Sequence, residues 1–142
     1  MEICRLAISD YEEMVRLWVT AKLPFKPKGR DSKEAMTSQM KANPEFFVGA
    51  FEDNRLIGTV IISGDKRKGW INRLAVDPDY RHRGIAKALI IKSEEVLKKR
   101  GIQIFCALIE DYNSASKKLF KRCGYVEHRD TIYFSKRDSD EV

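Results

Sequence analysis

The sequence has few of the residues that build metal sites or disulfide frameworks. It contains three cysteines, Cys4, Cys106 and Cys123, with no Cys-x-x-Cys spacing, and two histidines, His82 and His128. An odd, scattered set of cysteines argues against a disulfide framework and a zinc site, and it favours a reducing, cytoplasmic environment. Two histidines leave little material for a histidine-rich metal site or a Ser-His-Asp triad. We therefore expect no metal.

Long apolar runs and low-complexity segments are also lacking. No uninterrupted apolar run approaches the roughly 18 residues that cross a membrane, so we expect no membrane partner. The first residues lack the apolar core of a signal peptide. With 8 glycines, 4 prolines and 43% hydrophobic residues among 142, the composition is globular. The length predicts one domain, which we place at residues 1–136, followed by a charged tail at 137–142.

Basic residues outnumber acidic ones, 27 to 21, which gives a formal net charge of +6. Such a surplus fits nucleic acid, an anionic membrane, a small phosphorylated ligand or a lysine-rich solvated surface. The basic residues at 98–100 and 121–122 end predicted helices, where cations complement the helix dipole. The cluster at 81–83 instead precedes a predicted helix, where cations oppose the dipole. That placement requires a separate explanation.

Hydrophobic periodicity predicts a mixed α/β fold in the order β-α-α-β-β-β-α-β-α-β-β, with about seven strands and about four helices. We expect strands at 2–8, 46–51, 56–62, 70–76, 102–109, 125–127 and 132–134. A capping box at 9–12 predicts a first helix that ends before Pro24, and Asp31 or Ser32 starts a second that ends before Asn43. The remaining helices are expected at 84–99 and 113–124. The almost wholly apolar segment 102–109 is typical of a strand buried on both faces.

The turn before the longest predicted helix is the most informative stretch, and it reads Arg81, His82, Arg83, Gly84, Ile85, Ala86. The first turn of a helix has unpaired N–H groups and a partial positive charge. No Asp or Glu occurs between Tyr80 and Ser93, and Gly84 leaves the backbone accessible. The pattern predicts a seat for a phosphate or diphosphate. The alternative is a solvated basic turn whose glycine starts the helix.

Two motifs resemble those of a known family. The first runs from Trp70 to Ala86 as a strand, Leu74-Ala75-Val76-Asp77-Pro78, then Arg81-x-x-Gly84-x-Ala86. It resembles the acetyl-CoA-binding motif of the GNAT superfamily of N-acyltransferases. The second, Asn113-x-x-Ser116-x-x-Leu119-Phe120-x-x-x-Gly124-Tyr125, is similar to that family's Asn-x-x-Ala-x-x-Leu-Tyr-x-x-x-Gly-Phe. The predicted element order also matches the family's fold over nearly the whole chain, and small, stand-alone prokaryotic members are the most similar.

The resemblance implies an N-acetyltransferase that uses acetyl-CoA as co-substrate and needs no metal. The acetyl group would pass to a primary amine, of a small molecule or a protein, by direct attack in a ternary complex. Backbone groups of Leu74, Ala75 and Val76 would pair with the pantetheine arm, and the Val76 N–H would polarise the thioester carbonyl. The N–H groups from Arg81 to Ala86 would hold the diphosphate. Asn113, which also fits a plain helix N-cap, and Phe120 would contact the cofactor. A homodimer follows by the same analogy.

The sequence departs from the family pattern where acids and bases are expected. The family's tyrosine acid corresponds to Phe120, and two positions that hold a catalytic glutamate in relatives are Leu108 and Trp70. A thiol pKa of about 8.5 makes the thiolate a tolerable leaving group without an acid. We therefore expect an acceptor amine of low pKa, or a base acting through water. Glu110 is the candidate base because it shares strand parity with Leu108; the alternative is an exposed carboxylate at a strand end.

The acceptor side is expected at the loop 23–30. Phe25 would line the cleft, and Lys28 and Arg30 would favour an acceptor that carries a carboxylate or phosphate, although a solvated basic loop explains them too. Trp70 and Asn72 share one face of the neighbouring strand, where Asn72 could position a water. Two other functions compete with catalysis: an acyl-CoA-binding sensor or partner module, and a nucleic-acid-binding module. The latter is less favoured because the sequence lacks an aromatic stacking platform.

Overall fold

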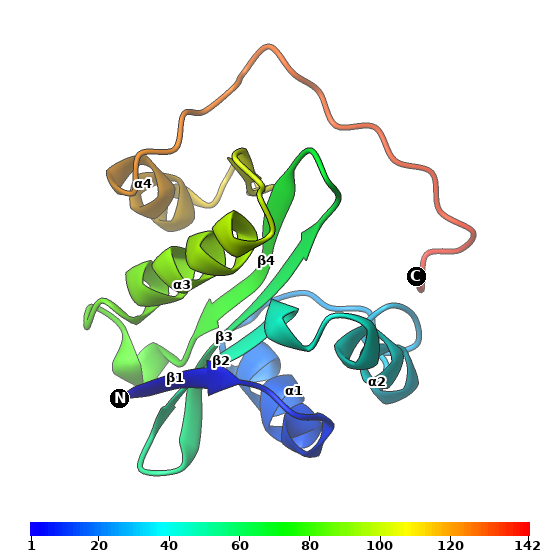
Figure 1. Ribbon diagram of the computed structural model, residues 1–142, viewed down its shortest axis with the longest axis vertical. Helices are drawn as coiled ribbons and strands as arrows, with labels where there is room; N and C mark the ends of the chain where they lie inside the picture. The colour runs from blue at the N-terminus through cyan, green and yellow to red at the C-terminus, as the bar shows by residue number, and fades with distance from the viewer.

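In the computed structural model, which describes residues 1–142, a five-stranded sheet in the order β1-β2-β3-β4-β5 separates two layers of helices (Figure 1). The antiparallel strands are β1 (Glu2–Arg5), β2 (Phe47–Glu52), β3 (Arg55–Gly64) and β4 (Gly69–Val76), and β5 (Phe105–Cys106) runs parallel to β4. The helices α1 (Tyr11–Thr20) and α2 (Lys33–Ala42) lie on one side, and α3 (Ile85–Lys99) and α4 (Ser114–Arg122) on the other. Short 3-10 turns precede α1, β2 and α3, namely η1 (Ile8–Asp10), η2 (Pro44–Phe46) and η3 (Pro78–Tyr80).

Tight turns join β2 to β3 and β3 to β4, so the strands predicted at 46–51, 56–62 and 70–76 form two consecutive hairpins. Asp53 and Asn54 have φ of 50° and 63°, as the hairpin turn with two left-handed residues requires. In the second turn the Asp65 carboxylate accepts hydrogen bonds from the backbone N–H groups of Arg67 and Lys68, at 2.6 and 2.8 Å. These bonds stabilise the charged carboxylate and lower the pKa of Asp65.

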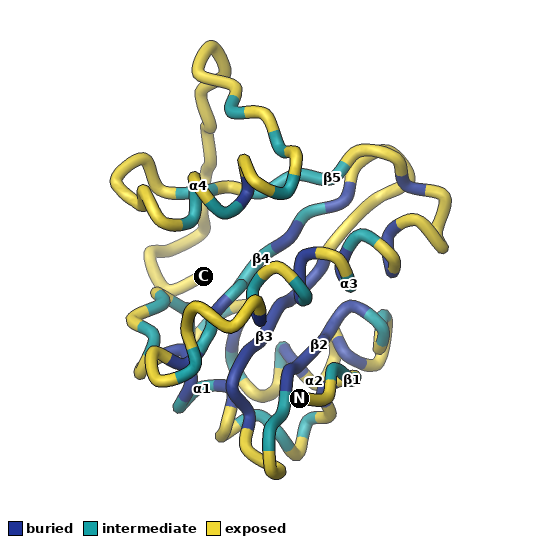
Figure 2. Tube along the Cα trace, turned by 90° about the vertical axis from the view of Figure 1, so that its left-hand side faces the viewer, coloured by how far each residue is buried: buried dark blue, intermediate teal, exposed yellow.

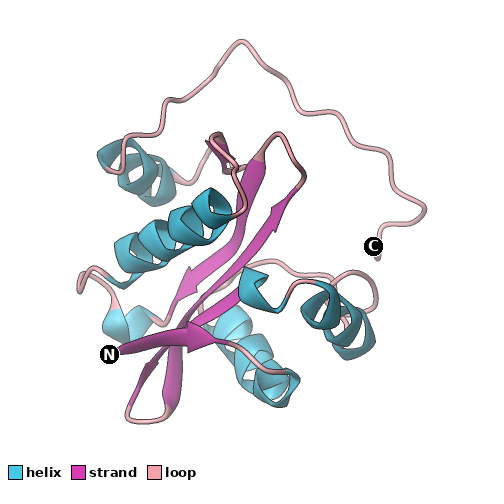
Figure 3. Cartoon of the chain, viewed as in Figure 1, coloured by secondary structure: helices cyan, strands magenta, loops and turns pink.

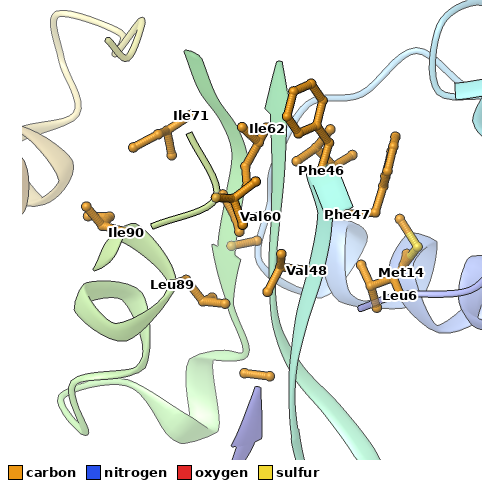
Figure 4. Packing of buried hydrophobic residues seen from close by; sticks show 14 of the residues in the cluster. Leu6, Met14, Phe46, Phe47, Val48, Val60, Ile62, Ile71, Leu89 and Ile90 are labelled. Atoms are coloured by element: carbon orange, nitrogen blue, oxygen red, sulfur yellow. The ribbon is translucent and has the colours of Figure 1, made fainter. Parts of the chain in front are cut away.

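The hydrophobic core lies on both faces of β2 and β3, which are the most deeply buried strands (Figure 2). Leu89 and Ile90 of α3 pack on one side of the sheet and Met14 of α1 on the other (Figure 4). Gly69 brings β4 close to α3, because a Cβ there would lie 2.4 Å from Leu97 Cδ1. None of the helices combines the length and apolar character that a membrane crossing requires.

The mixed α/β class and the four helices are confirmed, but the sheet has five strands instead of about seven. The predicted strand 102–109 is reduced to Phe105–Cys106. This strand pairs with β4 only opposite Gly69 and Trp70, and the two segments form no further pairs. Leu108 is 58% exposed, so the segment is not buried on both faces.

The predicted closing strands at 125–127 and 132–134 are wrong for this structure, in which the chain after α4 is a loop up to the C-terminus (Figure 3). No strand edge lies beside them, since β5 ends at Cys106. Their apolar side chains therefore remain exposed, 77% for Ile132 and 87% for Phe134.

One predicted helix start is wrong, and for the other the structure confirms one of the two predicted residues. Ser9 does not form a capping box; instead the Asp10 carboxylate accepts a 2.8 Å hydrogen bond from the Ala7 N–H, and η1 leads into α1. At α2, Ser32 is the N-cap and accepts from the Ala35 N–H at 3.1 Å. Asp31, the other predicted start, has a different role that is described below.

Candidate active site

The edge of β4 that faces β5 is open from Ile71 to Val76, because the two strands pair only at Gly69 and Trp70. The Asp77 N–H donates to the Ile57 carbonyl oxygen at 2.8 Å. Backbone groups alternate in direction along an antiparallel strand, so those of Val76 point away from β3 and toward the open edge, as do those of Leu74. The backbone of Ala75, predicted to act with them, is directed toward its β3 partner Thr59. The open edge therefore presents donors and acceptors from alternate residues.

A bulge interrupts β4 just before these residues. The pairing with β3 shifts between Thr59, opposite Ala75, and Ile61, opposite Asn72. Arg73 lies in the bulge with φ of 51°, a left-handed conformation that is unfavourable for a residue with a Cβ. Its carbonyl oxygen accepts a 3.0 Å hydrogen bond from the Thr59 hydroxyl, which in turn accepts one from Trp18 Nε1 at 3.0 Å. Side chains of β3 and α1 thus fix the bulge.

The turn after β4 carries a continuous run of unsatisfied backbone donors. None of the backbone N–H groups from Arg81 to Lys87 has an acceptor within the chain. His82 and Gly84 have φ of 64° and 77°, and the first turn of α3 contains no acidic residue. Consecutive N–H groups at a helix start, with left-handed residues among them, form a binding site for an anion. The structure thus brings the predicted diphosphate donors together and adds Lys87 to them.

Side chains of this turn leave the backbone donors free. Arg83 lies over the Tyr80 ring, 4.9 Å from its centroid, and pairs with Glu52 at 3.6 Å. Arg81 and His82 are exposed. Ile85 is buried and anchors the helix start on the sheet, beside Gly58 of β3. Glu52 therefore contacts a side chain of the turn and not its N–H groups.

The second group of predicted cofactor residues belongs to α4 and its N-cap. The Asn113 side-chain oxygen accepts from the Ser116 N–H at 3.1 Å, so Asn113 serves as an N-cap whatever else it binds. Phe120 is buried, and its ring meets the Tyr125 ring edge to face at 5.0 Å. The Tyr125 hydroxyl donates to Glu94 at 2.7 Å, and burial followed by this bond raises the pKa of Tyr125. Neither ring offers a free acid.

The candidate base Glu110 lies outside any strand. It is exposed, and its carbonyl oxygen accepts from the Asn113 N–H at 2.9 Å in a turn. The argument from strand parity with Leu108 is wrong, because β5 ends at Cys106. On β4, the Asn72 side-chain amide donates to Ser63 Oγ at 3.1 Å and so is held against β3, while Trp70 is partly buried.

The predicted acceptor loop contacts the C-terminal tail. Phe25 packs against Trp18 with ring centroids 5.5 Å apart. Lys26 Nζ donates to the Asp140 carbonyl oxygen at 2.6 Å, and Lys28 pairs with Glu141 at 3.7 Å. Arg30 is exposed, with its carbonyl oxygen bonded to the side chain of Gln39. The basic loop therefore already lies beside acidic residues of the same chain.

Asp31 and Arg73 were missed by sequence reasoning. Arg73 Nη2 donates to Asp31 Oδ2 at 2.8 Å, and the two side chains are 18% and 5% exposed. The same carboxylate oxygen accepts from the Lys26 N–H at 2.7 Å. The available signal was an arginine inside the otherwise mostly apolar strand 70–76, but its partner lies 42 residues away in the sequence.

Other features lie apart from this site. Two hollows of about 300 and 330 Å³ are lined by none of the predicted site residues, and they lie beside β1 and α3 and beside α2 and β2, respectively. No group of three His, Cys, Asp or Glu side chains is placed to hold a metal ion.

Comparison with known proteins identifies the family. Residues 11–125 match the family model described as the acetyltransferase (GNAT) family. The chain belongs to this family. It is 32% identical over 137 residues to an acetyltransferase of Yersinia pestis and 30% identical over 138 residues to one of Photorhabdus laumondii. In both cases the match covers 96% of this chain and 95% of the relative.

A solved structure agrees with this assignment. The PaiA N-acetyltransferase of Thermoplasma acidophilum, determined in complex with coenzyme A, is 26% identical and superposes with a TM-score of 0.72. The match covers 86% of this GNAT protein and 87% of PaiA. The resemblance drawn from the two sequence motifs is therefore confirmed, and this chain is a GNAT acetyltransferase.

Proposed function

We propose that this protein transfers an acetyl group from acetyl-CoA to a primary amine by direct attack in a ternary complex. One observation carries the proposal: the open edge of β4 leads within a few residues to the unbonded N–H groups from Arg81 to Lys87. The first element suits an extended amide-containing arm, and the second suits a diphosphate. The coenzyme A complex of the relative PaiA supports the same ligand.

Each part of the site has a role in holding the co-substrate. The backbone groups of Leu74 and Val76 bind the pantetheine arm as an added strand would, with Ala75 between them. The Val76 N–H, directed to the open edge, donates to the thioester oxygen as negative charge develops there. The N–H groups from Arg81 through His82, Arg83, Gly84 and Ile85 to Ala86 hold the diphosphate. Asn113 and Phe120 border the cofactor from α4.

The chemistry places one requirement on the acceptor. The amine nitrogen forms a bond to the thioester carbon, the carbon–sulfur bond breaks, and the thiolate leaves while the nitrogen loses a proton to solvent or a base. Only a neutral amine can attack. An α-amine, with a pKa of roughly 7.7–8.0, is substantially neutral near physiological pH, whereas a lysine amine of pKa roughly 10.4 is not. Because Phe120, Leu108 and Trp70 supply no base, we propose a low-pKa amine, with Glu110 acting through water as the alternative.

We also propose that the acceptor carries a carboxylate or phosphate. Lys28 and Arg30 lie in the loop beside Phe25, on the α1 and α2 side of the sheet. The contacts of Lys26 with the Asp140 carbonyl and of Lys28 with Glu141 support this, because they show that the loop accommodates an acidic segment. An exposed ion pair such as that of Lys28 with Glu141 contributes little to stability, about 0–1 kcal/mol, so an acceptor can displace the tail.

We also propose that the protein forms a homodimer. The apolar side chains of Ile132, Tyr133 and Phe134 are exposed next to one another, which is typical of a surface that is covered by a partner. Analytical ultracentrifugation tests the state of association. A monomer at all concentrations would contradict this part of the proposal without affecting catalysis.

The central experiment combines binding and transfer. Calorimetric titration with acetyl-CoA should give saturable heat, and at 100 times Kd the ligand should stabilise the fold by about 2.7 kcal/mol. A panel of amines, including α-amines and lysine side-chain amines with and without a carboxylate, is then assayed by mass spectrometry. Absence of heat and of stabilisation would overturn the proposal. Stabilisation without transfer to any amine would instead support the non-catalytic sensor.

A further inference from the structure

We infer that Asp31 is a positioning residue for acetyl transfer: its carboxylate holds the β4 bulge that directs the Leu74 and Val76 backbone, and it ties the acceptor loop to that bulge. The inference rests on the proposed function. It concerns an ion pair in which Asp31 lies outside both sequence motifs and Arg73 is not one of the residues that define the first. Three observations carry it: the strained backbone of Arg73, the direction of its side chain and the hydrogen bonds of Asp31.

The Arg73 backbone requires support from outside the strand. A non-glycine residue with φ of 51° costs on the order of 1–3 kcal/mol, and it persists only when neighbouring contacts hold it. Thr59 supplies one such contact at the Arg73 carbonyl oxygen, at 3.0 Å. Because backbone direction alternates with a period of two, loss of the bulge would turn the following backbone groups to the opposite side. The Val76 N–H would then no longer face the open edge.

The side chain of Arg73 shows what the bulge achieves. Gly69 lies against Leu97 of α3, and Ile71 lies on the same side of the sheet as Ile90 (Figure 4). Regular alternation would send the Arg73 side chain to that side as well. Instead it reaches Asp31, which lies in the loop between α1 and α2 on the opposite side. The ion pair is therefore tied to the left-handed conformation.

Asp31 is the only hydrogen-bond acceptor for the Arg73 guanidinium, whose Nε is buried without a partner. The pair is almost enclosed, so removal of the carboxylate leaves a buried charge uncompensated. Asp31 Oδ2 also accepts from the Lys26 N–H at 2.7 Å, and the Asp31 carbonyl oxygen accepts from the Tyr11 hydroxyl at 2.7 Å. One residue thus connects the acceptor loop, α1 and the strand that binds the thioester.

The test substitutes the carboxylate by an amide, Asp31→Asn, which keeps the shape and an acceptor for the Lys26 N–H. Infrared difference spectra with carbonyl-labelled acetyl-CoA report how strongly the bound thioester is polarised, without any acceptor. We expect the wild-type protein to shift the carbonyl stretch to lower frequency and Asp31→Asn to reduce that shift. Affinity for coenzyme A should stay within about twofold, because the α3 donors are unchanged, while kcat falls by up to about 10²-fold.

Two further variants separate positioning from stability. In the double variant Arg73→Gly/Asp31→Asn, both charges are gone and glycine adopts the left-handed conformation without a steric cost. It should recover part of the carbonyl shift and of kcat relative to Asp31→Asn. Glu45→Gln is the control, because it breaks the partly buried ion pair of Glu45 with Arg100, which includes no residue of β4 or of the acceptor loop. It should change neither readout.

The outcomes distinguish this inference from the proposed function. If the wild-type protein does not bind acetyl-CoA, the proposed function fails. If the wild-type protein transfers acetyl groups and Asp31→Asn keeps both the carbonyl shift and kcat, only the positioning role is wrong. If Asp31→Asn does not fold, Thr59→Val tests the bulge from its other side. A reduced carbonyl shift in that variant supports the inference, and an unchanged shift overturns it.

Discussion

The hydroxyl of Tyr125 donates a 2.7 Å hydrogen bond to the carboxylate of Glu94. This bond joins the chain after α4 to the C-terminal half of α3. The Tyr125 ring also meets Phe120 edge to face. The remaining chain after α4 forms no strand, and these two contacts hold its start, at Tyr125, against α3 and α4. Burial, with Glu94 as the second cause, raises the pKa of Tyr125 above its usual value of 10.0.

This pKa shift predicts a loss of stability in alkaline solution. Above about pH 10 the unfolded chain loses the Tyr125 proton while the folded protein keeps it, so the unfolding free energy falls as pH rises. Below pH 10 the contribution of Tyr125 should be constant. Thermal melts of wild type and Tyr125→Phe should differ by about 1 kcal/mol near neutral pH, with the difference shrinking above pH 10. A difference that is independent of pH would contradict this assignment.

Gly84 offers a test of the diphosphate seat with a matched control. Gly84 and Gly101 have φ of 77° and 79°, and neither has an atom within 4 Å of an added Cβ. Replacement by alanine should therefore destabilise the fold similarly, by about 1 kcal/mol in each case. Only Gly84→Ala should weaken acetyl-CoA binding, by roughly tenfold, because strain there disturbs the N–H groups of the α3 start. Calorimetric titration measures both variants, and equal affinities would argue against the seat.

The fold was predictable where local patterns decide the structure. The strands predicted at 46–51 and 56–62 and the helix predicted at 84–99 depend on patterns among neighbouring residues, and they formed as β2, β3 and α3. The strands at 102–109, 125–127 and 132–134 depend on a partner edge, which a local pattern does not contain. Ile132 and Phe134 are residue types that are common in strands. They remain exposed because β5 is too short to pair with their segment.

The candidate site also has one part that local sequence patterns predict and one part that depends on distant residues. The N–H groups from Arg81 to Ala86 belong to one contiguous turn, so composition and spacing were enough to find them. The pair of Asp31 and Arg73 joins two segments through a bulge, and no periodicity predicts where a bulge falls. The parity argument for Glu110 failed for a related reason, since it assumed a strand that tertiary pairing does not maintain beyond Cys106.

Asn113 is predicted to have two roles that a pair of variants can separate. Its side chain caps α4 as that of Ser32 caps α2, with acceptor distances of 3.1 Å in both. Asn113→Ala and Ser32→Ala should each lose about 1 kcal/mol of stability, measured by urea unfolding. If Asn113 also binds the cofactor, only its variant should lose affinity for acetyl-CoA. Equal affinity in the two variants would leave Asn113 as a structural cap alone.

Glu110→Gln decides between the two routes by which the acceptor amine loses its proton. Glu110 is exposed and outside β5, so we expect kcat/KM to change less than about twofold across the pH range, against 10²–10⁴-fold for the loss of a general base. The rate should then rise with pH through the pKa of the amine, because only its neutral form attacks. Glu45→Gln serves as a control for the loss of a carboxylate elsewhere. A large decrease at low pH that disappears as the amine deprotonates would instead show that Glu110 is the base, acting through water, and would remove the need for a low-pKa acceptor.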